Sequence, residues 1–307
     1  MAELEVRNLT KRYGRTVAVD DLSFEVHAGR VTGFLGPNGA GKTTTMRALL
    51  GLLRPTRGEA LVDGQPPVQM TDPLRTIGAA LEATAFHPGR SGRAHLRVLA
   101  SAARIPMSRV EEVLELVELS GAAGRRVGGY SLGMRQRLAL AAALLGEPRT
   151  LILDEPANGL DPQGMRWLRD LLRAQAAEGR TVLVSSHVLS EVAQTADELI
   201  LIRGGKLVSQ TTLAEFTAAD AGWVRVRAVR LDELARGLGE GKATVRRDEE
   251  GALLVEGASA EEIGELALSL GIALHELAPQ RSSLEERFLE VMGEESETPP
   301  AEGEAGA

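Results

Sequence analysis

The segment from Gly36 to Thr43 reads Gly-Pro-Asn-Gly-Ala-Gly-Lys-Thr and matches the pattern G-x-x-x-x-G-K-[ST]. In such a loop, glycines let backbone N–H groups crowd around a phosphate at the start of a helix, where the helix dipole favours anions. The apolar run from Val31 to Leu35 precedes the loop, and helix-forming residues follow it. This setting predicts a binding site for a nucleoside triphosphate rather than an ordinary glycine-rich turn.

The side chains of this loop each have an expected partner on a triphosphate. Lys42 bridges the β- and γ-phosphates, Thr43 offers its hydroxyl to Mg²⁺, and Thr44 contacts an oxygen of the α-phosphate. The other residues expected to surround the phosphates are Gly36, Asn38, Gly39 and Gly41. By itself the loop predicts only that a nucleoside triphosphate binds, because motors, kinases and GTPases share it.

Two adjacent carboxylates, Asp154 and Glu155, follow a second apolar run at Leu151–Leu153. Side chains on a strand alternate, so these carboxylates point in different directions and can take different roles. We expect Asp154 to hold Mg²⁺, directly or through water, and Glu155 to orient and deprotonate the water that attacks the γ-phosphate. Together with the loop, the pair predicts hydrolysis as well as binding.

The elements that must position these residues follow from the apolar pattern. Strand-like runs alternate with helical patterns up to about residue 215, which predicts an α/β domain with a largely parallel sheet. Continuous apolar runs suit strands that are buried on both faces, and a third such run, Thr181–Val184, precedes His187. Ligands of open α/β sheets bind beyond the carboxyl ends of the strands. The phosphate-binding loop, the carboxylate pair and His187 each follow such a strand.

The order of predicted elements divides the chain into parts. Helical periodicity replaces the strand signal between about 83 and 146, which predicts an inserted helical subdomain. A βαββαβ order over 218–293 predicts a small α+β domain of ferredoxin-like topology. Ser259 with Glu262 and Ser283 with Glu286 form capping boxes. The tail at 294–307 is rich in Glu, Pro and Gly and is expected to be disordered.

The expected bounds of these elements can be stated individually. The helices of the subdomain are predicted near Arg93–Ala103, Arg109–Leu119 and Leu132–Leu145. The strands of the last domain are predicted at Trp223–Val229, Thr244–Arg247, Leu253–Glu256 and Ile272–Leu277. Its helices are predicted near Leu231–Leu238, Ala260–Leu270 and Leu284–Met292.

The composition excludes several functional classes. A net charge of −8 and an aromatic content of 3% disfavour nucleic acid as a partner. The chain has no cysteine, which suits a reducing cytoplasm. Its longest apolar run, Leu138–Leu145, is far shorter than the roughly 18–20 residues that cross a bilayer. No secretory signal is visible at the N-terminus, so any role at a membrane requires another chain that supplies the spans.

Residues 1–217 resemble the ATP-binding cassette ATPases of ABC transporters. The most diagnostic segment is Tyr130–Arg137, Tyr-Ser-Leu-Gly-Met-Arg-Gln-Arg, which is similar to the family's LSGGQ signature. The resemblance implies ATP as the nucleotide. It also implies a P-loop NTPase fold, with a RecA-like core, a mostly parallel sheet, an antiparallel β edge and the inserted helical subdomain.

The resemblance further implies a head-to-tail homodimer with shared sites. In it, Ser131 and the Gly133 backbone contact the γ-phosphate held by the other copy, which agrees with the anion affinity of helix N-caps. Asp161 is similar to the residue that communicates across the dimer. His187 falls where the family has its switch histidine, which contacts the γ-phosphate and helps position the attacking water. Tyr13 resembles the aromatic residue that stacks on adenine.

The sequence departs from the family pattern at two places. The family has a glutamine at the joint between core and helical subdomain, where it contacts Mg²⁺ and the transmembrane partner, whereas this chain has Glu82. A carboxylate there would ligate Mg²⁺ but add negative charge near the γ-phosphate. In the signature, Leu132 and Met134 replace the usual Gly and Gln, while the phosphate-facing serine and glycine remain.

These departures and the C-terminal region resemble bacterial exporter ATPases associated with antibiotic resistance, of the bacitracin and daunorubicin type. The resemblance implies a peripheral subunit on the cytoplasmic side of the membrane, driving export of a drug, lipid-like molecule or peptide through a separate permease. An importer ATPase differs only in its partner. Two further alternatives are a soluble ABC-type ATPase acting on ribosomes or DNA, and a nucleotide-binding regulator, for which the general base at Glu155 would be unnecessary.

Overall fold

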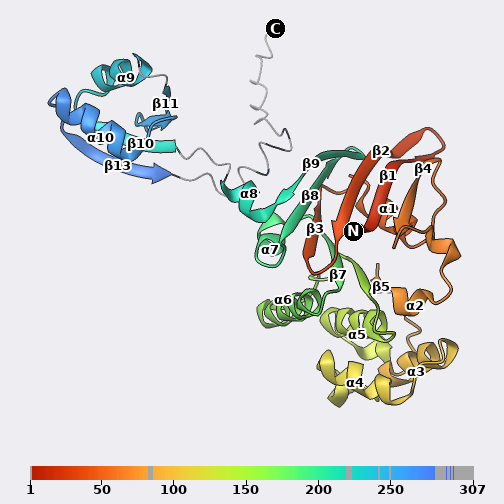
Figure 1. Ribbon diagram of the computed structural model, residues 1–307. Helices are drawn as coiled ribbons and strands as arrows, with labels where there is room; N and C mark the ends of the chain where they lie inside the picture. The colour runs from red at the N-terminus through yellow and green to blue at the C-terminus, as the bar shows by residue number, and fades with distance from the viewer. Residues whose placement is uncertain are drawn as a thin grey trace, which may run out of the picture. The chain divides into compact units, whose positions relative to one another are not determined.

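The computed structural model describes residues 2–81, 86–218, 223–240, 243–248 and 250–280, together with 288, 291 and 293. The chain divides into two compact units, residues 1–213 and 214–307, which are described one at a time (Figure 1). Three predictions lie outside the described residues. They are Glu82, the tail at 294–307, and most of the helix at Leu284–Met292 with its capping box.

A six-stranded sheet forms the centre of the first unit, with the strand order β5-β6-β7-β3-β8-β9. The strands are β3 (Val31–Leu35), β5 (Ile77–Ala80), β6 (Thr150–Asp154), β7 (Thr181–Ser186), β8 (Glu198–Arg203) and β9 (Lys206–Thr212). All neighbours pair in parallel except β8 and β9, which are antiparallel. Every residue of β3, β6 and β7 is buried, which explains their continuous apolar runs.

An antiparallel sheet of three strands lies beside the parallel one. Its order is β2-β1-β4, with β1 at Ala2–Tyr13, β2 at Thr16–His27 and β4 at Arg57–Val62. Helix α1 (Lys42–Leu49) contacts all three strands and also β6. The core between them includes Phe24 and Phe34, whose ring centroids are 5.3 Å apart. The antiparallel edge and the parallel sheet confirm the predicted fold class.

Three helices of the first unit lie where helical periodicity predicts them: α3 (Gly92–Ala102), α4 (Ser108–Leu116) and α5 (Leu132–Leu144). Ser91 and Ser131 are the N-caps of α3 and α5, and each hydroxyl accepts a hydrogen bond from a backbone N–H of the first turn. The three helices pack on one another, and α5 packs against β5. Shorter elements are η1 (Pro67–Gln69), α2 (Pro73–Thr76), η2 (Ser120–Ala122) and η3 (Val127–Gly129).

Helices α6 (Pro162–Ala177) and α7 (Leu189–Ala193) both pack against β3 and β7. Helix α7 lies so close to the sheet that a Cβ at Gly33 of β3 would stand 2.2 Å from Cγ1 of Val192. The short helix α8 (Leu213–Ala218) follows β9. The turn that carries His187 is therefore held between β7 and a helix that is fixed to the sheet.

The second unit contains a four-stranded antiparallel sheet in the order β11-β12-β10-β13. Its elements are β10 (Trp223–Ala228), α9 (Leu231–Glu240), β11 (Thr244–Arg247), β12 (Leu253–Glu256), α10 (Ala260–Ser269) and β13 (Leu274–Gln280). This chain order and this strand order together are the ferredoxin-like topology that the sequence predicts. The capping box of Ser259 and Glu262 is present at the start of α10.

One strand of this unit begins later than expected. Ile272, predicted as the first residue of the last strand, instead completes the end of α10. Its N–H donates to Ala267 O at 2.8 Å, and Gly271, with a φ of 62°, donates to Leu268 O at 3.0 Å. These two bonds form a Schellman motif, in which the hydrophobic residue after the glycine packs back on the helix. Ile272 is buried in this way, and β13 starts at Leu274.

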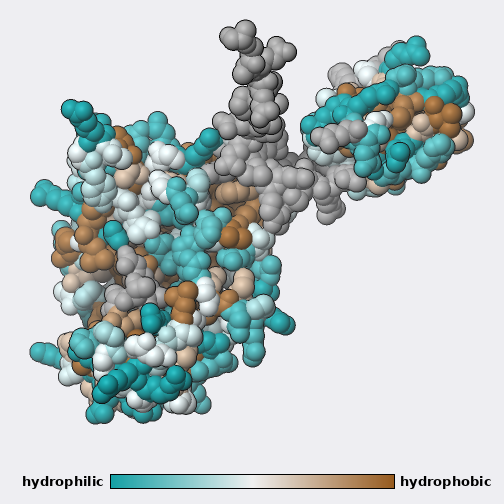
Figure 2. All heavy atoms as spheres, turned by 180° about the vertical axis from the view of Figure 1, so that it is seen from behind, coloured by the Kyte–Doolittle hydropathy of each residue, from teal (hydrophilic) through white to brown (hydrophobic). Residues whose placement is uncertain are grey.

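Apolar side chains reach the surface of the molecule among polar ones (Figure 2). The most exposed large apolar residues of the first unit are Val68, at 79%, and Leu52, at 69%. Within the described ranges, none of the helices is both long enough and apolar enough to span a bilayer.

Candidate active site

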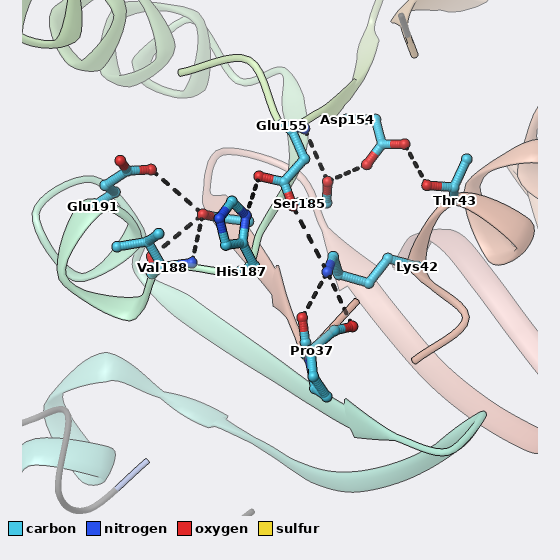
Figure 3. A network of polar contacts seen from close by, with 11 residues as sticks. Pro37, Lys42, Thr43, Asp154, Glu155, Ser185, His187, Val188 and Glu191 are labelled. Carbon is cyan, nitrogen blue, oxygen red and sulfur yellow. Dashed lines mark hydrogen bonds and ion pairs between the residues drawn. The ribbon is translucent and has the colours of Figure 1, made fainter. Parts of the chain in front are cut away.

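The three segments with predicted catalytic or binding residues meet at one edge of the parallel sheet. Strands β6, β7 and β3 are adjacent, and Asp154 of β6 pairs with Ser185 of β7. Leu35 of β3 pairs with Ser186, also of β7. Because these strands are parallel, the phosphate-binding loop, the two carboxylates and His187 all leave the sheet at its carboxyl edge. Figure 3 shows the polar contacts that join them.

Packing requires two glycines of the phosphate-binding loop. A Cβ at Gly36 would lie 2.4 Å from the carbonyl oxygen of Ile202, and one at Gly41 would lie 2.7 Å from that of Ala18. Gly39 and Gly41 both have a positive φ, of 82° and 106°, but only Gly39 has open space around its Cβ position. The loop is therefore held against β8 at Gly36 and against β2 at Gly41, and it is open at its middle, where Asn38 and Gly39 are exposed.

Lys42 is the first residue of α1, and its side chain is only 7% exposed. Its ammonium donates to Gly36 O at 2.6 Å and to Pro37 O at 3.4 Å, and it lies 3.7 Å from Oε1 of Glu155. The charge is thus held inside the curve of the loop and faces Glu155 (Figure 3). A buried ammonium whose hydrogen-bond partners are mostly neutral carbonyls fits an incoming phosphate oxygen.

Next along α1, the hydroxyl of Thr43 donates to Oδ2 of Asp154 at 2.6 Å. The other oxygen of this carboxylate, Oδ1, accepts a hydrogen bond from Ser185 Oγ. Mg²⁺ takes hard oxygen ligands and is commonly held by one or two carboxylates together with phosphate oxygens. A hydroxyl and a carboxylate that touch beside a phosphate loop are such a donor set, so these residues fit Mg²⁺. Thr44 follows Thr43 on α1 and is half-buried.

Glu155 is the first residue after β6 and has a φ of 50°, in the left-handed region. This conformation is uncommon for a residue with a Cβ, and such strain is often found at functional sites. It directs the carboxylate toward two basic side chains. Oε1 lies 3.7 Å from Lys42 Nζ, and Oε2 lies 2.8 Å from Nδ1 of His187. Each carboxylate oxygen of Glu155 therefore faces a different nitrogen.

The turn around His187 is stabilised by Ser186. The hydroxyl of Ser186 accepts a hydrogen bond from Val188 N at 3.0 Å and lies 3.4 Å from Oε2 of Glu191, on α7. The imidazole of His187 is 42% exposed, so it is reachable from solvent while one ring nitrogen contacts Glu155. The two serines serve different partners: Ser185 contacts Asp154 and the N–H of Glu155, whereas Ser186 contacts Val188 and Glu191.

Four other predicted residues are not in this contact network. Ser131 and Asp161 are N-caps, and their side chains accept from Met134 N at 3.2 Å and Gly164 N at 2.7 Å. Gly133 lies on the first turn of α5, and a Cβ there would be 3.1 Å from Gly159 O. Tyr13 ends β1, is 48% exposed, and has Lys11 Nζ 5.1 Å from its ring centroid. The described contacts of these residues are local to their own elements or to a neighbouring turn.

Two features of this region had no predicted role. Ser185 is fully buried and contacts both members of the carboxylate pair, Asp154 and Glu155. The exposed Leu132, which departs from the family signature, packs on Gly159, where a Cβ would lie 2.3 Å from Leu132 Cδ2. A serine at the end of an apolar strand, two residues before a histidine, was a visible signal for the first. The second depends on two separate turns and had no local signal.

Comparison with known proteins agrees with this geometry. A family model described as ABC transporter matches residues 19–158. A second model, described as a domain of unknown function (DUF8746), matches residues 222–285. The first match contains the phosphate-binding loop, the signature segment and the carboxylate pair.

Two relatives extend the similarity, one of them to nearly the whole chain. An uncharacterized ABC transporter ATP-binding protein, YhcH of Bacillus subtilis (strain 168), is 38% identical over 301 residues, which cover 96% of this chain and 97% of YhcH. The bacitracin transport ATP-binding protein BcrA of Bacillus licheniformis is 43% identical over 210 residues, covering 67% of this chain and 69% of BcrA.

A solved structure titled as that of the ATP binding subunit of an ABC transporter has a TM-score of 0.63 and 25% identity. The match covers 86% of this chain and 99% of that one. The residues that meet at this sheet edge agree with a similarity that extends over nearly the full length of YhcH. The chain therefore belongs to the ATP-binding proteins of ABC transporters, which are ATPases.

Proposed function

We propose that two copies of this chain bind MgATP between them, hydrolyse it, and drive export through a separate transmembrane permease at the cytoplasmic face of the membrane. The observation that carries the catalytic part is the position of Glu155, held between Lys42 and His187 beside the Thr43–Asp154 pair. At the edge of a phosphate loop, the carboxylate can act as the base and the lysine can neutralise phosphate charge, two functions that phosphoryl transfer to water uses.

In this proposal, the residues of the cluster divide phosphate binding, metal binding and proton transfer among them. The backbone at Gly36, Asn38, Gly39 and Gly41 surrounds the phosphates, and Lys42 neutralises their charge. Thr43 and Asp154 hold Mg²⁺, which offsets charge on the β- and γ-phosphate oxygens when bound. Glu155 accepts the proton of the attacking water, and His187 holds Glu155 in position and reaches the γ-phosphate. Thr44 binds the α-phosphate and Tyr13 stacks on adenine, for which its exposed ring is suitable.

The dimer is proposed because one copy supplies only part of the site. The hydroxyl of Ser131, the first turn of α5 at Gly133, and Asp161 are absent from the described contacts around Lys42 and Glu155. Ser131 and Gly133 begin a helix, where backbone N–H groups bind anions. A second copy arranged head to tail would bring this N-terminus to the γ-phosphate. The site is then complete only when ATP joins two copies.

The proposal that the chain drives export rests on the similarity to its relatives and on its sequence. The bacitracin transport relative and the resemblance to antibiotic-resistance exporters both favour a drug, a lipid-like molecule or a peptide as substrate. A separate permease is proposed from the same resemblance, and none of the described helices can span a bilayer. We also propose residues 1–217 as the cassette, about 83–146 as its helical subdomain, and 218–293 as a separate domain. Glu82 is proposed as an additional Mg²⁺ ligand.

Replacement of Glu155 by Gln tests the catalytic and dimer proposals together. The amide keeps the size of the side chain but removes the base, so ATP should bind without being hydrolysed. We expect Glu155→Gln to form a dimer with ATP and Mg²⁺ that persists in light scattering, and to remain monomeric with ADP. Glu178→Gln, at the exposed end of α6, should behave as wild type. Wild-type hydrolysis by Glu155→Gln would contradict the assignment of the base.

The transport proposal needs the permease. The chain is purified from its own membranes without stripping, and the membrane protein that accompanies it is reconstituted with it in vesicles, with bacitracin as the probe. ATP added on the side of the bound chain should move the probe away from that side and should be hydrolysed faster. Movement toward the ATP side would instead support the importer alternative. Hydrolysis that is unaffected by the membrane protein would contradict the transporter assignment.

A further inference from the structure

The hydroxyl of Ser185 contacts both carboxylate residues of the site. It donates to Oδ1 of Asp154 and accepts a hydrogen bond from the backbone N–H of Glu155 at 3.0 Å. Ser185 is 0% exposed, and its strand β7 lies between β6 and β3. The hydroxyl can donate only one hydrogen bond, and Asp154 receives it. Figure 3 shows this hydroxyl between Asp154 and Glu155.

The contact with Asp154 constrains the orientation of a carboxylate. The Asp154 carboxylate could turn about its χ2 torsion, which is broad for this residue type. Because Ser185 holds Oδ1, the other oxygen, Oδ2, is directed to the Thr43 hydroxyl at 2.6 Å. Ser185 therefore fixes the orientation in which the Asp154 carboxylate presents its other oxygen to the proposed metal position.

The contact with Glu155 acts on the backbone. Strand β6 ends at Asp154, so the N–H of Glu155 is the first donor beyond the strand. Ser185 Oγ accepts from it and anchors the residue where its backbone enters the left-handed region, at φ 50°. That conformation aims the carboxylate at His187 and Lys42. A buried donor left without this partner would favour a different backbone conformation.

We infer that Ser185 is a positioning residue that orients both the metal-binding carboxylate of Asp154 and the catalytic base Glu155 through one hydroxyl. This inference rests on the proposed function. Residues that orient a metal ligand are commonly worth about 10- to 100-fold in metal affinity or activity when they are replaced. Ser185 acts on the γ-phosphate reaction only through these two carboxylates.

The chain offers a matched control in the same sheet. Thr150 begins β6, is 1% exposed, and its hydroxyl has no hydrogen-bond partner among the described residues. Thr150→Val removes a buried hydroxyl at the opposite end of the strand that carries Asp154. It should leave both hydrolysis and the response to Mg²⁺ unchanged.

The experiment compares wild type with Ser185→Ala, Ser185→Cys, Ser185→Thr and Thr150→Val in the full chain. Calorimetry measures the affinity for ATP without Mg²⁺ and the Mg²⁺ concentration that half-saturates the ATP-bound protein, while kcat and KM are measured separately. We expect Ser185→Ala to bind ATP alone as wild type does, because Lys42 and the loop are intact. Its half-saturating Mg²⁺ concentration should rise and its kcat should fall, by about 10- to 100-fold in each case.

The other two variants separate hydrogen bonding from volume. Cysteine keeps the size of the side chain but is a weak donor and acceptor, so Ser185→Cys should resemble Ser185→Ala. Threonine keeps the hydroxyl, and Ser185→Thr should recover most of the kcat and of the Mg²⁺ response. If Ser185→Ala does not fold, the Cys and Thr variants carry the comparison.

The inference is overturned if Ser185→Ala or Ser185→Cys equals wild type in both Mg²⁺ half-saturation and kcat, or if Thr150→Val is impaired to the same extent. These outcomes differ from a failure of the proposed function. In that case the wild type itself would lack Mg²⁺-dependent ATP hydrolysis, before any variant is compared.

Discussion

The Nδ1 atom of His187 lies 2.8 Å from Oε2 of Glu155, which brings together residues at the ends of two neighbouring strands. If His187 acts mainly by holding the base, its removal should matter only while the base is present. We expect Glu155→Gln to lower kcat on the order of 10²- to 10⁴-fold, as loss of a general base does. His187→Ala should lower it less.

A double-mutant cycle measures this dependence. The variant with both changes should be little slower than Glu155→Gln alone, because groups that act as a unit are not additive. His27→Ala, a half-buried histidine on β2, serves as the control and should retain wild-type kcat. Fully additive losses would show that His187 acts on the γ-phosphate independently of Glu155.

Replacement of Lys42 by Met should weaken ATP binding. The ammonium is nearly buried and held by Gly36 O and Pro37 O, so it is placed to hydrogen-bond phosphate oxygens. Hydrogen bonds to charged groups contribute about 1.5–3 kcal/mol, which corresponds to about a 10- to 100-fold loss of affinity. Titration calorimetry with ATP measures it. Lys206→Met, which breaks an exposed ion pair with Asp20, should bind ATP as wild type does.

The contact between Leu132 and Gly159 links the signature turn to the segment before Asp161. Gly159 has a φ of 79°, and a Cβ there would lie 2.3 Å from Leu132 Cδ2. Gly159→Ala should lower the free energy of unfolding by about 1–2 kcal/mol for the left-handed backbone and by about 1–3 kcal/mol more for overpacking. Gly179→Ala isolates the first effect, because Gly179 has a φ of 86° and open space around it.

The contribution of Leu132 is tested in the same series by chemical denaturation. In a Leu132→Ala background, the cost of Gly159→Ala should shrink to about that of Gly179→Ala, because the clashing side-chain atoms are gone. Equal costs of Gly159→Ala with and without Leu132 would mean that the two turns do not contact each other in solution.

In the second unit, Arg225 hydrogen-bonds Asp248 and holds the pKa of that carboxyl below its usual range, with further help from the backbone N–H groups of Ala252 and Glu250. A carboxyl whose pKa is lower in the folded state adds stability above its unfolded pKa, about 3.9, and this stability is lost as the pH falls through the folded value. Asp248→Asn should therefore destabilise this unit at pH 7.

The difference between Asp248→Asn and the parent should shrink as the pH is lowered below about 4. The chain has two tryptophans, so in a Trp167→Phe background the fluorescence of Trp223 reports on the second unit during unfolding. Glu261→Gln, an exposed change on α10, is the control and should have little effect. A destabilisation by Asp248→Asn that stays constant down to pH 3 would contradict the role of Arg225.

Several elements could be predicted from the sequence because the causes of their formation are local. Val31–Leu35 and Thr244–Arg247 form strands with the expected bounds, since runs of apolar or alternating residues suit buried and half-buried strands. The capping box at Ser259 depends on a partner three residues away. The Schellman end of α10 at Gly271 is equally local, and the glycine was the signal that would have moved the start of β13 to Leu274.

The catalytic and binding residue types, and the resemblance to the family, were determined by the sequence alone, since the phosphate loop, the Tyr130–Arg137 signature and the Asp154-Glu155 pair are contiguous motifs. Which atoms meet was decided only by the tertiary structure. Ser185 reaches the carboxylate of Asp154 and the backbone N–H of Glu155 because β6 and β7 pair in a register that sets Asp154 opposite Ser185. Because β6 and β7 are buried on both faces, their apolar residues do not alternate and do not favour one register, which is set by packing across the sheet.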